Sequence, residues 1–274
     1  MSLLTKDRQI ASQFMIATEY ATAPCVPFPQ IITEKLNGLR ARYFPGRGWY
    51  SRDGILWSAD VLAHIETPLL RTGKEAFNAA PVDCELYCPD MSLQEINSAV
   101  GIARYKPGPG FEKVKAYVFD LALDMIARDR LKVMQHVIGE NIEIVPYTIV
   151  NNRAEADAVF ETIRAQGKEG IIYRALMSPY CGGPSRNLLK RKAWLDGEFP
   201  VVGAVEGEKD CKGVLGALVC LHPNGQRFNV GSGYTREQRV EWLLSPPAKI
   251  KVQYITLSDA GVPQNPSFMC VEVP

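Results

Sequence analysis

The chain has 274 residues, of which 46% are hydrophobic and 22% are charged, and its formal net charge is +1 at pH 7. This composition is typical of a globular protein with a hydrophobic core, and the length accommodates one large domain or two modest ones. The near-zero net charge excludes binding to nucleic acid through overall charge, so phosphate contacts must come from local clusters of basic residues.

Neither end of the chain has the features of a membrane or secretory segment. No run of 18 or more apolar residues occurs, and the charged residues Lys6, Asp7 and Arg8 lie where a secretory peptide needs its apolar stretch. We therefore expect a cytoplasmic protein. Seven cysteines are scattered along the chain without a Cys-x-x-Cys pair, which favours reduced, packed thiols over a zinc site.

The first part of the chain, up to about residue 195, is dominated by β-like segments. Residues rich in β-branched and aromatic side chains predict strands over 30–43, 49–57, 82–87 and 115–123. Arg52-Asp53-Gly54 has the composition of a hairpin-like turn. We expect antiparallel sheets in this part of the chain.

One helix is well defined by the sequence. Apolar side chains recur at 3.6-residue spacing from Arg153 to Gln166, with Asn152 as the expected N-cap and Gly167 as the expected end. A short apolar strand, Gly170 to Tyr173, follows immediately. The helix is therefore expected to flank a sheet.

Asp196-Gly197-Glu198 marks an expected boundary between a first domain, residues 1–195, and a second domain, residues 196–274. The sequence beyond it predicts short strands over 199–205, 214–221, 227–230 and 249–256. Pro223-Asn224-Gly225 predicts a hairpin turn, and Thr235-x-x-Gln238 predicts a capping box for a helix ending near Leu244. This pattern fits a small β-barrel such as an OB-fold.

Lys35 is the first candidate for covalent chemistry. It follows the apolar residues Ile31 and Ile32 and precedes Asn37-Gly38, where glycine permits close backbone approach or a positive φ. An amine attacks phosphorus only when it is deprotonated, so a nucleophilic lysine needs neighbours that favour loss of its proton. Nearby cations such as Arg40, Arg52 or Lys190 could have this effect. Taken alone, this short segment fits an ordinary surface lysine.

Three carboxylates are candidates for metal binding or proton transfer. Asp83 and Glu85 lie on one face of a predicted strand, with Cys84 on the other. Such a pair suits a metal ion, a ribose hydroxyl or proton transfer, and equally an ordinary solvent-facing surface. Glu169 lies between a helix end and a buried strand, where an unpaired carboxylate would be costly.

Basic residues gather just before the expected domain boundary. Lys190 and Lys192 lie on the same side of an extended segment. Two ammonium groups in this arrangement repel each other unless an anion lies between them, and lysine binds phosphate as a mobile point charge. The alternative interpretation is a basic surface loop.

Six short motifs follow one another in a specific order. They are Lys35-x-Asn-Gly-x-Arg40, Ser51-Arg52-x-Gly54, Asp83-x-Glu85-Leu86, Tyr117-Val118-Phe119-Asp120, Glu169-Gly170-Ile171-Ile172-Tyr173-Arg174 and Leu189-Lys190-x-Lys192. In this order and spacing the chain resembles the covalent nucleotidyltransferase superfamily of DNA ligases, RNA ligases and mRNA capping enzymes. It looks most like the minimal ATP-dependent DNA ligases of bacteriophages and large viruses, from about residue 30 to the end.

The resemblance implies a nucleotide pocket around the first two motifs. Lys35 would form a lysyl-AMP phosphoramidate, Thr33 would contact the adenine edge, and Glu34 would lie beside them in the nucleotide-binding site. Arg40 and Arg52 would bind ribose, the AMP phosphate or the 5′-phosphate of a nick.

The remaining motifs imply the rest of the pocket. Glu85 would hold the ribose hydroxyl and help to bind metal, and Phe119 would stack on adenine. Glu169 would ligate Mg²⁺, or Mn²⁺ in its place. Lys190 and Lys192 would neutralise the α-phosphate.

The fold implied by the resemblance is α+β: an ATP-grasp-like nucleotidyltransferase domain with antiparallel sheets and flanking helices, followed by a small OB-fold β-barrel. The implied activity is sealing of 5′-phosphate/3′-hydroxyl nicks in duplex DNA through lysyl-AMP and DNA-adenylate. The protein is expected to act as a monomer that clamps around the duplex and contacts its backbone. Only 34 residues precede Lys35, which favours ATP over NAD.

Three positions depart from the family pattern. Asn37 stands where ligases more often carry Asp, and Gln264 and Glu272 stand where relatives have arginines. Those arginines orient the pyrophosphate leaving group, so we expect either slow charging with AMP or a substitute cation. The candidates for that cation are Arg236, Arg239, Lys249 and Lys251.

Three other functions fit parts of the same pattern. An RNA ligase would use the same motif order, and a capping guanylyltransferase would use GTP. A nucleic-acid-binding module that has lost catalysis would also explain the missing C-terminal arginines. The retention of Lys35, Glu85, Glu169 and Lys190 argues against the last of these, because binding alone does not require all four.

Overall fold

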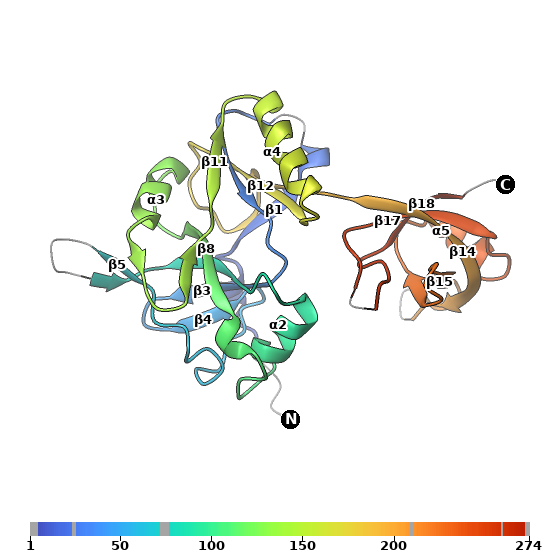
Figure 1. Cartoon of the computed structure of the whole chain (residues 1–274), viewed down its shortest axis with the longest axis horizontal. Helices are drawn as coiled ribbons and strands as arrows, with labels where there is room; N and C mark the ends of the chain where they lie inside the picture. The colour runs from blue at the N-terminus through green and yellow to red at the C-terminus, as the bar shows by residue number, and fades with distance from the viewer. Residues whose placement is uncertain (1–4, 24–25, 72–76, 209–210, 259, 272–274) are drawn as a thin grey trace. The chain divides into compact units, whose positions relative to one another are not determined.

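The computed structural model describes residues 5–23, 26–71, 77–208, 211–258 and 260–271 (Figure 1). The chain divides into two compact units, and the division falls between Arg191 and Lys192. Within the described ranges, no helix combines the length and the apolar character that a membrane span requires.

Unit 1 contains a five-stranded sheet in which β2 lies between β12 and the edge strand β11. The strand order is β1 (Met15–Glu19), β13 (Gly183–Lys192), β12 (Gly170–Ala175), β2 (Gln30–Glu34) and β11 (Tyr147–Val150). The helix α4 (Arg153–Ala165) packs against β12 and β11. Residues 30–33 of β2 are buried, as expected for the apolar pair Ile31 and Ile32 that precedes Lys35.

A second five-stranded sheet of unit 1 carries the other predicted site residues. Its order is β10 (Ile142–Ile144), β8 (Lys115–Leu121), β7 (Val82–Tyr87), β3 (Leu39–Phe44) and β4 (Gly48–Ser51). The helices α2 (Leu93–Val100) and α3 (Ala127–Met134) pack against β3 and β8 respectively. A large apolar cluster that includes Cys84, Leu86, Val118 and Leu121 forms its core.

Three shorter strands and three short helical segments complete unit 1. The strands β6 (Phe77–Ala79), β5 (Leu69–Arg71) and β9 (Val137–Ile138) form a small sheet in that order. The helical segments are α1 (Arg8–Ala11) and two 3₁₀ turns, Tyr20–Thr22 and Phe111–Lys113.

Most predicted elements of unit 1 are confirmed. The strand over 82–87 coincides with β7, and the turn at 52–54 is closed by a hydrogen bond from Gly54 N to Ser51 O of 2.9 Å. The side chain of Asn152 accepts a hydrogen bond from Glu155 N, and Gly167 has φ +70°, as its predicted cap and end require. The segment 30–43 is two strands, because the chain leaves one sheet after Glu34 and enters the other at Leu39.

Unit 2 is a five-stranded antiparallel sheet with one helix. The order is β16 (Arg227–Val230), β15 (Leu215–Leu221), β14 (Leu195–Glu206), β17 (Lys249–Tyr254) and β18 (Ser267–Val271). The helix α5 (Arg236–Trp242) packs against β15 and begins with the predicted capping box. Residues 196–198 lie within β14 and pair with β17.

The expected OB-fold β-barrel is confirmed only in part, because the sheet of unit 2 is not closed into a barrel within the described residues. No ladder joins the edge strands β16 and β18, and a single parallel bridge between Ser232 and Ser267 links the chain near these two edges. Sequence patterns predict the strands but not closure, because closure depends on pairing between distant segments. The unit is an open, OB-like sheet.

Candidate active site

The loop that carries Lys35 connects the two large sheets of unit 1. Lys35 N donates to Gly170 O at 2.9 Å, which fixes the start of the loop to β12. At the other end, a Cβ on Gly38 would lie 2.3 Å from Leu86 O, so only glycine allows the loop to approach β7 this closely. Gly38 N also donates to Glu85 Oε1 at 3.1 Å. The predicted close approach at Gly38 is confirmed.

Lys35 and Glu169 form an ion pair. Lys35 Nζ lies 2.6 Å from Glu169 Oε1, and the two side chains are 23% and 9% exposed. The second oxygen, Glu169 Oε2, is buried and has no hydrogen-bond partner among the described residues. A buried carboxylate oxygen without a partner is costly, so this position favours a further cation or proton.

Glu85 lies in the same charged environment. Burial raises the pKa of Glu85 from 4.5 to about 7, although the charges of Lys35 and Arg40 and the hydrogen bond from Gly38 oppose this rise. The neighbouring charge of Glu169 adds to the increase. A carboxylate whose pKa lies near neutrality beside a second carboxylate suits cation binding or proton transfer.

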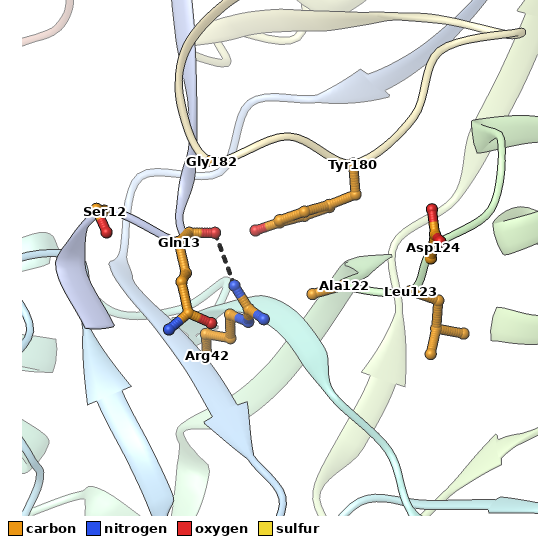
Figure 2. A pocket seen from close by; sticks show the side chains of 8 residues that line it. All are labelled: Ser12, Gln13, Arg42, Ala122, Leu123, Asp124, Tyr180 and Gly182. Carbon is orange, nitrogen blue, oxygen red and sulfur yellow. Dashed lines mark hydrogen bonds between the residues drawn. The ribbon is translucent and has the colours of Figure 1, made fainter. Parts of the chain in front are cut away.

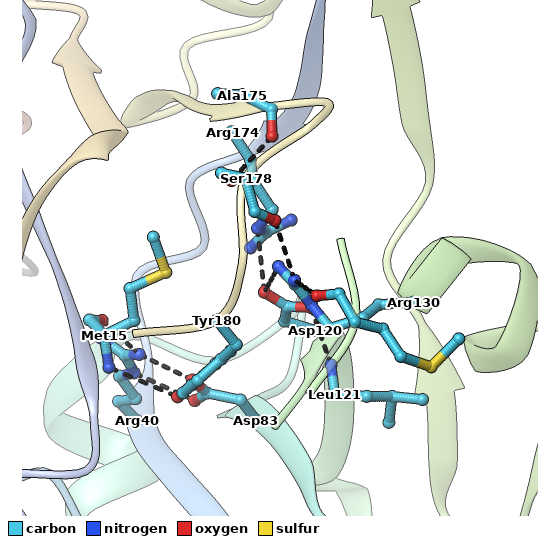
Figure 3. Close-up of polar contacts among 11 residues, drawn as sticks. Met15, Arg40, Asp83, Asp120, Leu121, Arg130, Arg174, Ala175, Ser178 and Tyr180 are labelled. Carbon is cyan, nitrogen blue, oxygen red and sulfur yellow. Dashed lines mark hydrogen bonds and ion pairs between the residues drawn. The ribbon is translucent and has the colours of Figure 1, made fainter. Parts of the chain in front are cut away.

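Arg40 is held by a buried carboxylate (Figure 3). Its Nε and Nη2 donate to the two oxygens of Asp83 at 3.1 and 2.7 Å, and Nη2 also donates to Met15 O at 2.7 Å. Tyr180 Oη donates to the same Asp83 at 2.7 Å. The guanidinium carbon lies 5.5 Å from the centroid of the Phe119 ring. Arg40 and Phe119 therefore lie side by side in a fixed geometry.

A second buried charge network lies next to Phe119 along β8. Arg130 donates to both oxygens of Asp120 at 2.8 and 3.1 Å, and Arg174 Nε lies 3.0 Å from Asp120 Oδ2 (Figure 3). Arg130 Nη1 further donates to Ser178 O at 3.1 Å. These contacts join the end of β8 to α3 and β12, so they fix the backbone on which Phe119 is carried.

Other predicted residues are engaged in their own contacts. Thr33 is buried on β2, and Glu34 at the end of β2 forms an ion pair with Lys168. Lys190 Nζ lies 3.0 Å from Glu19 Oε1, in a parallel pairing of β1 with β13. Lys190, which is expected to bind phosphate, is therefore paired with the carboxylate of Glu19.

Arg52 lies in a turn of unit 1, and Lys192 and Gln264 belong to unit 2. Arg52 is exposed in its turn and forms no ion pair or hydrogen bond with Lys35, Glu85 or Glu169. Lys192 Nζ lies 5.1 Å from the centroid of the Trp194 ring. In unit 2, Gln264 N donates to Thr256 O at 2.8 Å, and Glu272 lies outside the described residues.

Two residues organise the site through contacts that the sequence does not predict. The strand pattern predicts Asp83 only as one of a pair of carboxylates on one face, whereas the Asp83 carboxylate accepts hydrogen bonds from both Arg40 and Tyr180. Tyr180 lies in the segment between β12 and β13 and has no periodic or motif context. Its distance of 97 positions from Asp83 leaves no local signal of the contact.

The geometry of unit 1 agrees with the comparison to known families. Residues 9–192 match the model of the ATP dependent DNA ligase domain, which is more than half of the chain. The chain belongs to the ATP-dependent DNA ligase family. Residues 206–271 match the DNA ligase OB-like domain. The two units are thus an α+β adenylation domain and an OB-like domain, and ATP-dependent DNA ligation is the activity of this ligase.

Individual relatives match this chain over most of the length of both proteins. The ligase is 25% identical to a DNA ligase of Haemophilus influenzae over 261 residues, which are 92% of this chain and 90% of that protein. Its fold is similar to that of a Lig E DNA ligase, with a TM-score of 0.77, 22% identity and coverage of 94% and 98% of the two chains. The ligase of bacteriophage T7 in complex with ATP gives a TM-score of 0.52, 14% identity and coverage of 96% and 100%.

Proposed function

We propose that Lys35 is the nucleophile of this ligase and that it seals nicks in duplex DNA in three transfers. Lys35 Nζ attacks the α-phosphorus of ATP and pyrophosphate leaves, then the AMP passes to the 5′-phosphate of the nick. The 3′-hydroxyl finally attacks that phosphate and AMP leaves. The observation that carries the proposal is the Lys35–Glu169 ion pair of 2.6 Å beside the second carboxylate, Glu85.

The surrounding residues support this assignment through positioning and charge. Glu169 is placed to accept the proton that the Lys35 ammonium must lose before attack. Phe119 presents a flat ring for the adenine, next to an Arg40 that Asp83 holds in place. Such fixed groups stabilise a phosphoryl-transfer transition state without reorganisation.

The carboxylates fit a magnesium ion. Glu169 Oε2 is a buried oxygen with no hydrogen-bond partner among the residues described, and burial opposes ionisation of Glu85, so both groups favour an additional cation. Mg²⁺ binds through one or two carboxylates and keeps waters and phosphate oxygens as its other ligands. Glu169 and Glu85 would hold the Mg²⁺ ion, which would neutralise the negative charge of the phosphates.

Covalent labelling tests the assignment of Lys35. The protein is incubated with α-labelled ATP and magnesium, and digestion followed by mass measurement locates the AMP adduct. We expect the adduct on the peptide of Lys35, no label in Lys35→Ala, and normal label in the control Lys115→Ala, whose side chain pairs with Glu143 on the surface. Label on another lysine, or label retained by Lys35→Ala, would contradict the proposal.

The preference for DNA over RNA strands at the nick follows from the family and is tested separately. Adenylylated protein is offered nicked DNA, nicked RNA and DNA–RNA hybrids of one sequence. Sealing of nicked DNA with the highest kcat/KM is expected for a monomer that holds duplex DNA with its OB-like unit. A preference for nicked RNA would favour an RNA ligase.

A further inference from the structure

A pocket of about 440 Å³ opens in unit 1 next to the network of Asp83 and Arg40 (Figure 2). Its lining includes the buried Arg42 and the ring of Tyr180, and the exposed residues Gln13 and Asp124 lie around it. None of these side chains was assigned a role in nucleotide binding.

Arg42 is a buried cation without a carboxylate partner. The residue is only 7% exposed, and it forms no ion pair with any described residue. Its Nη1 donates to Gln13 O at 2.7 Å, while its buried Nε has no hydrogen-bond partner in the part of the chain that the structure describes. The rings of Phe44 and Tyr180 lie 4.3 and 5.3 Å from its guanidinium carbon. These rings stabilise the charge but do not neutralise it.

The guanidinium is directed into the pocket. Figure 2 shows it between the backbone of Gln13 and the ring of Tyr180, with Asp124 across the open space. An uncompensated buried charge is destabilising, so an anion bound here would remove a cost already present in the fold. The fork of an arginine matches the oxygens of a phosphate group.

The pocket wall is held by close backbone packing. A Cβ on Gly182 would lie 2.1 Å from Ser12 O, so these two segments are in contact. Gly183 N donates to Phe14 O at 2.8 Å just behind them. The wall is fixed by the pairing of β1 with β13 rather than by flexible side chains, which favours a defined binding geometry.

We propose that this pocket is a second phosphate site of the ligase, in which Arg42 binds a phosphate group adjacent to the active site. The link to catalysis is Tyr180, which lines the pocket and donates to the carboxylate that holds Arg40. The choice of phosphate over carboxylate rests on the proposed function, since ATP, pyrophosphate and DNA are all phosphate compounds. The group belongs either to free pyrophosphate or phosphate, or to the DNA strand.

Binding measurements on the full chain test the site at constant ionic strength. The probes are inorganic phosphate, pyrophosphate, acetate, and nicked duplexes that carry either a 5′-phosphate or a 5′-hydroxyl. We expect Arg42→Gln to weaken binding of at least one phosphate probe tenfold or more, and Arg42→Lys to weaken it less. The control is Arg47→Gln, an exposed arginine on the turn between β3 and β4, which should bind as wild type does.

A second variant keeps the test decisive if Arg42→Gln does not fold. Asp124 is exposed and carries the same sign of charge as phosphate, so Asp124→Asn should strengthen phosphate binding several-fold. An effect of Arg42→Lys or Asp124→Asn on free phosphate or pyrophosphate assigns the free anion. An effect confined to the 5′-phosphorylated nick assigns the DNA strand.

Two results overturn the proposal. One is wild-type affinity of folded Arg42→Lys and Asp124→Asn for every phosphate probe, and the other is an Arg42-dependent affinity for acetate but not for phosphate. Uptake of AMP from ATP by the wild type is measured in the same preparations. Normal AMP uptake with no Arg42-dependent binding removes this inference alone, whereas absent uptake removes the proposed function.

Discussion

Replacement of Glu85 by glutamine should stabilise the unliganded ligase at pH 8 although it removes a site residue. The pKa of Glu85 rises from 4.5 to about 7 because burial outweighs the charges of Lys35 and Arg40. One pKa unit corresponds to about 1.4 kcal/mol, so keeping Glu85 ionised costs up to roughly 3 kcal/mol. Glutamine is neutral and retains the oxygen that accepts from Gly38 N. At about 2–4 °C per kcal/mol for a chain of this size, Tm should rise by several degrees.

The pH dependence of this gain is its specific signature. Between pH 4.5 and about 7 the folded protein keeps a proton on Glu85 that the unfolded chain has released. The stability of the wild type contributed by this group therefore falls as pH rises through that window and is constant above it. The glutamine variant has no such proton, so its advantage should be absent near pH 4.5 and should level off above pH 7.

Thermal unfolding in a metal chelator, followed from about pH 5 to pH 9, measures this difference. Glu143→Gln is the matched control, because Glu143 is 48% exposed in a surface ion pair with Lys115 and should show no such growth with pH. A Tm for Glu85→Gln below that of the wild type at pH 8 would refute the reasoning. So would an advantage that is the same at every pH.

Four further substitutions test residues of the two units. Phe119→Ala should weaken the use of ATP by roughly 1–3 kcal/mol, the scale of a stacking contact, measured as kcat/KM for ATP with Phe119→Leu as control. Tyr180→Phe removes the hydroxyl that donates to Asp83 and should cost about 1 kcal/mol of stability and slow AMP uptake in rapid-quench assays. Arg236 is a candidate for the cation that replaces the missing C-terminal arginines, since it is exposed and forms no ion pair with a described residue. Arg236→Gln should therefore slow AMP uptake from ATP but not the sealing of a pre-adenylylated nick. Arg239→Gln should instead lower Tm, since that guanidinium donates to three backbone carbonyls.

Local features of the sequence predicted local structure. The alternation of Asp83, Cys84 and Glu85 placed the thiol in the core and the carboxylates on the other face, as β7 shows. Cap residues defined α4 because their hydrogen bonds involve neighbours three positions away. The helix α2 was missed although Ser92-x-x-Glu95 forms a complete capping box, so in this case the signal was present.

Long-range features could not be read from the sequence. The pairs Arg40–Asp83, Tyr180–Asp83 and Lys190–Glu19 join segments that are 43, 97 and 171 positions apart (190 − 19 for the last). No periodicity encodes such contacts, because they depend on the order of strands in the sheets. The open edge of unit 2 has the same origin.

The ion pairs of the unliganded site differ in how readily a nucleotide can replace the carboxylate. Asp83 is 1% exposed and also binds Tyr180, so separating it from Arg40 would leave a buried charge uncompensated. Glu19 is 46% exposed, so water can solvate it as soon as it leaves Lys190. A triphosphate should therefore displace Glu19 from Lys190 at little cost while Arg40 keeps its partner. From the burial of the two pairs we therefore expect Lys190 to exchange its carboxylate partner when ATP binds, and Arg40 to keep its fixed position.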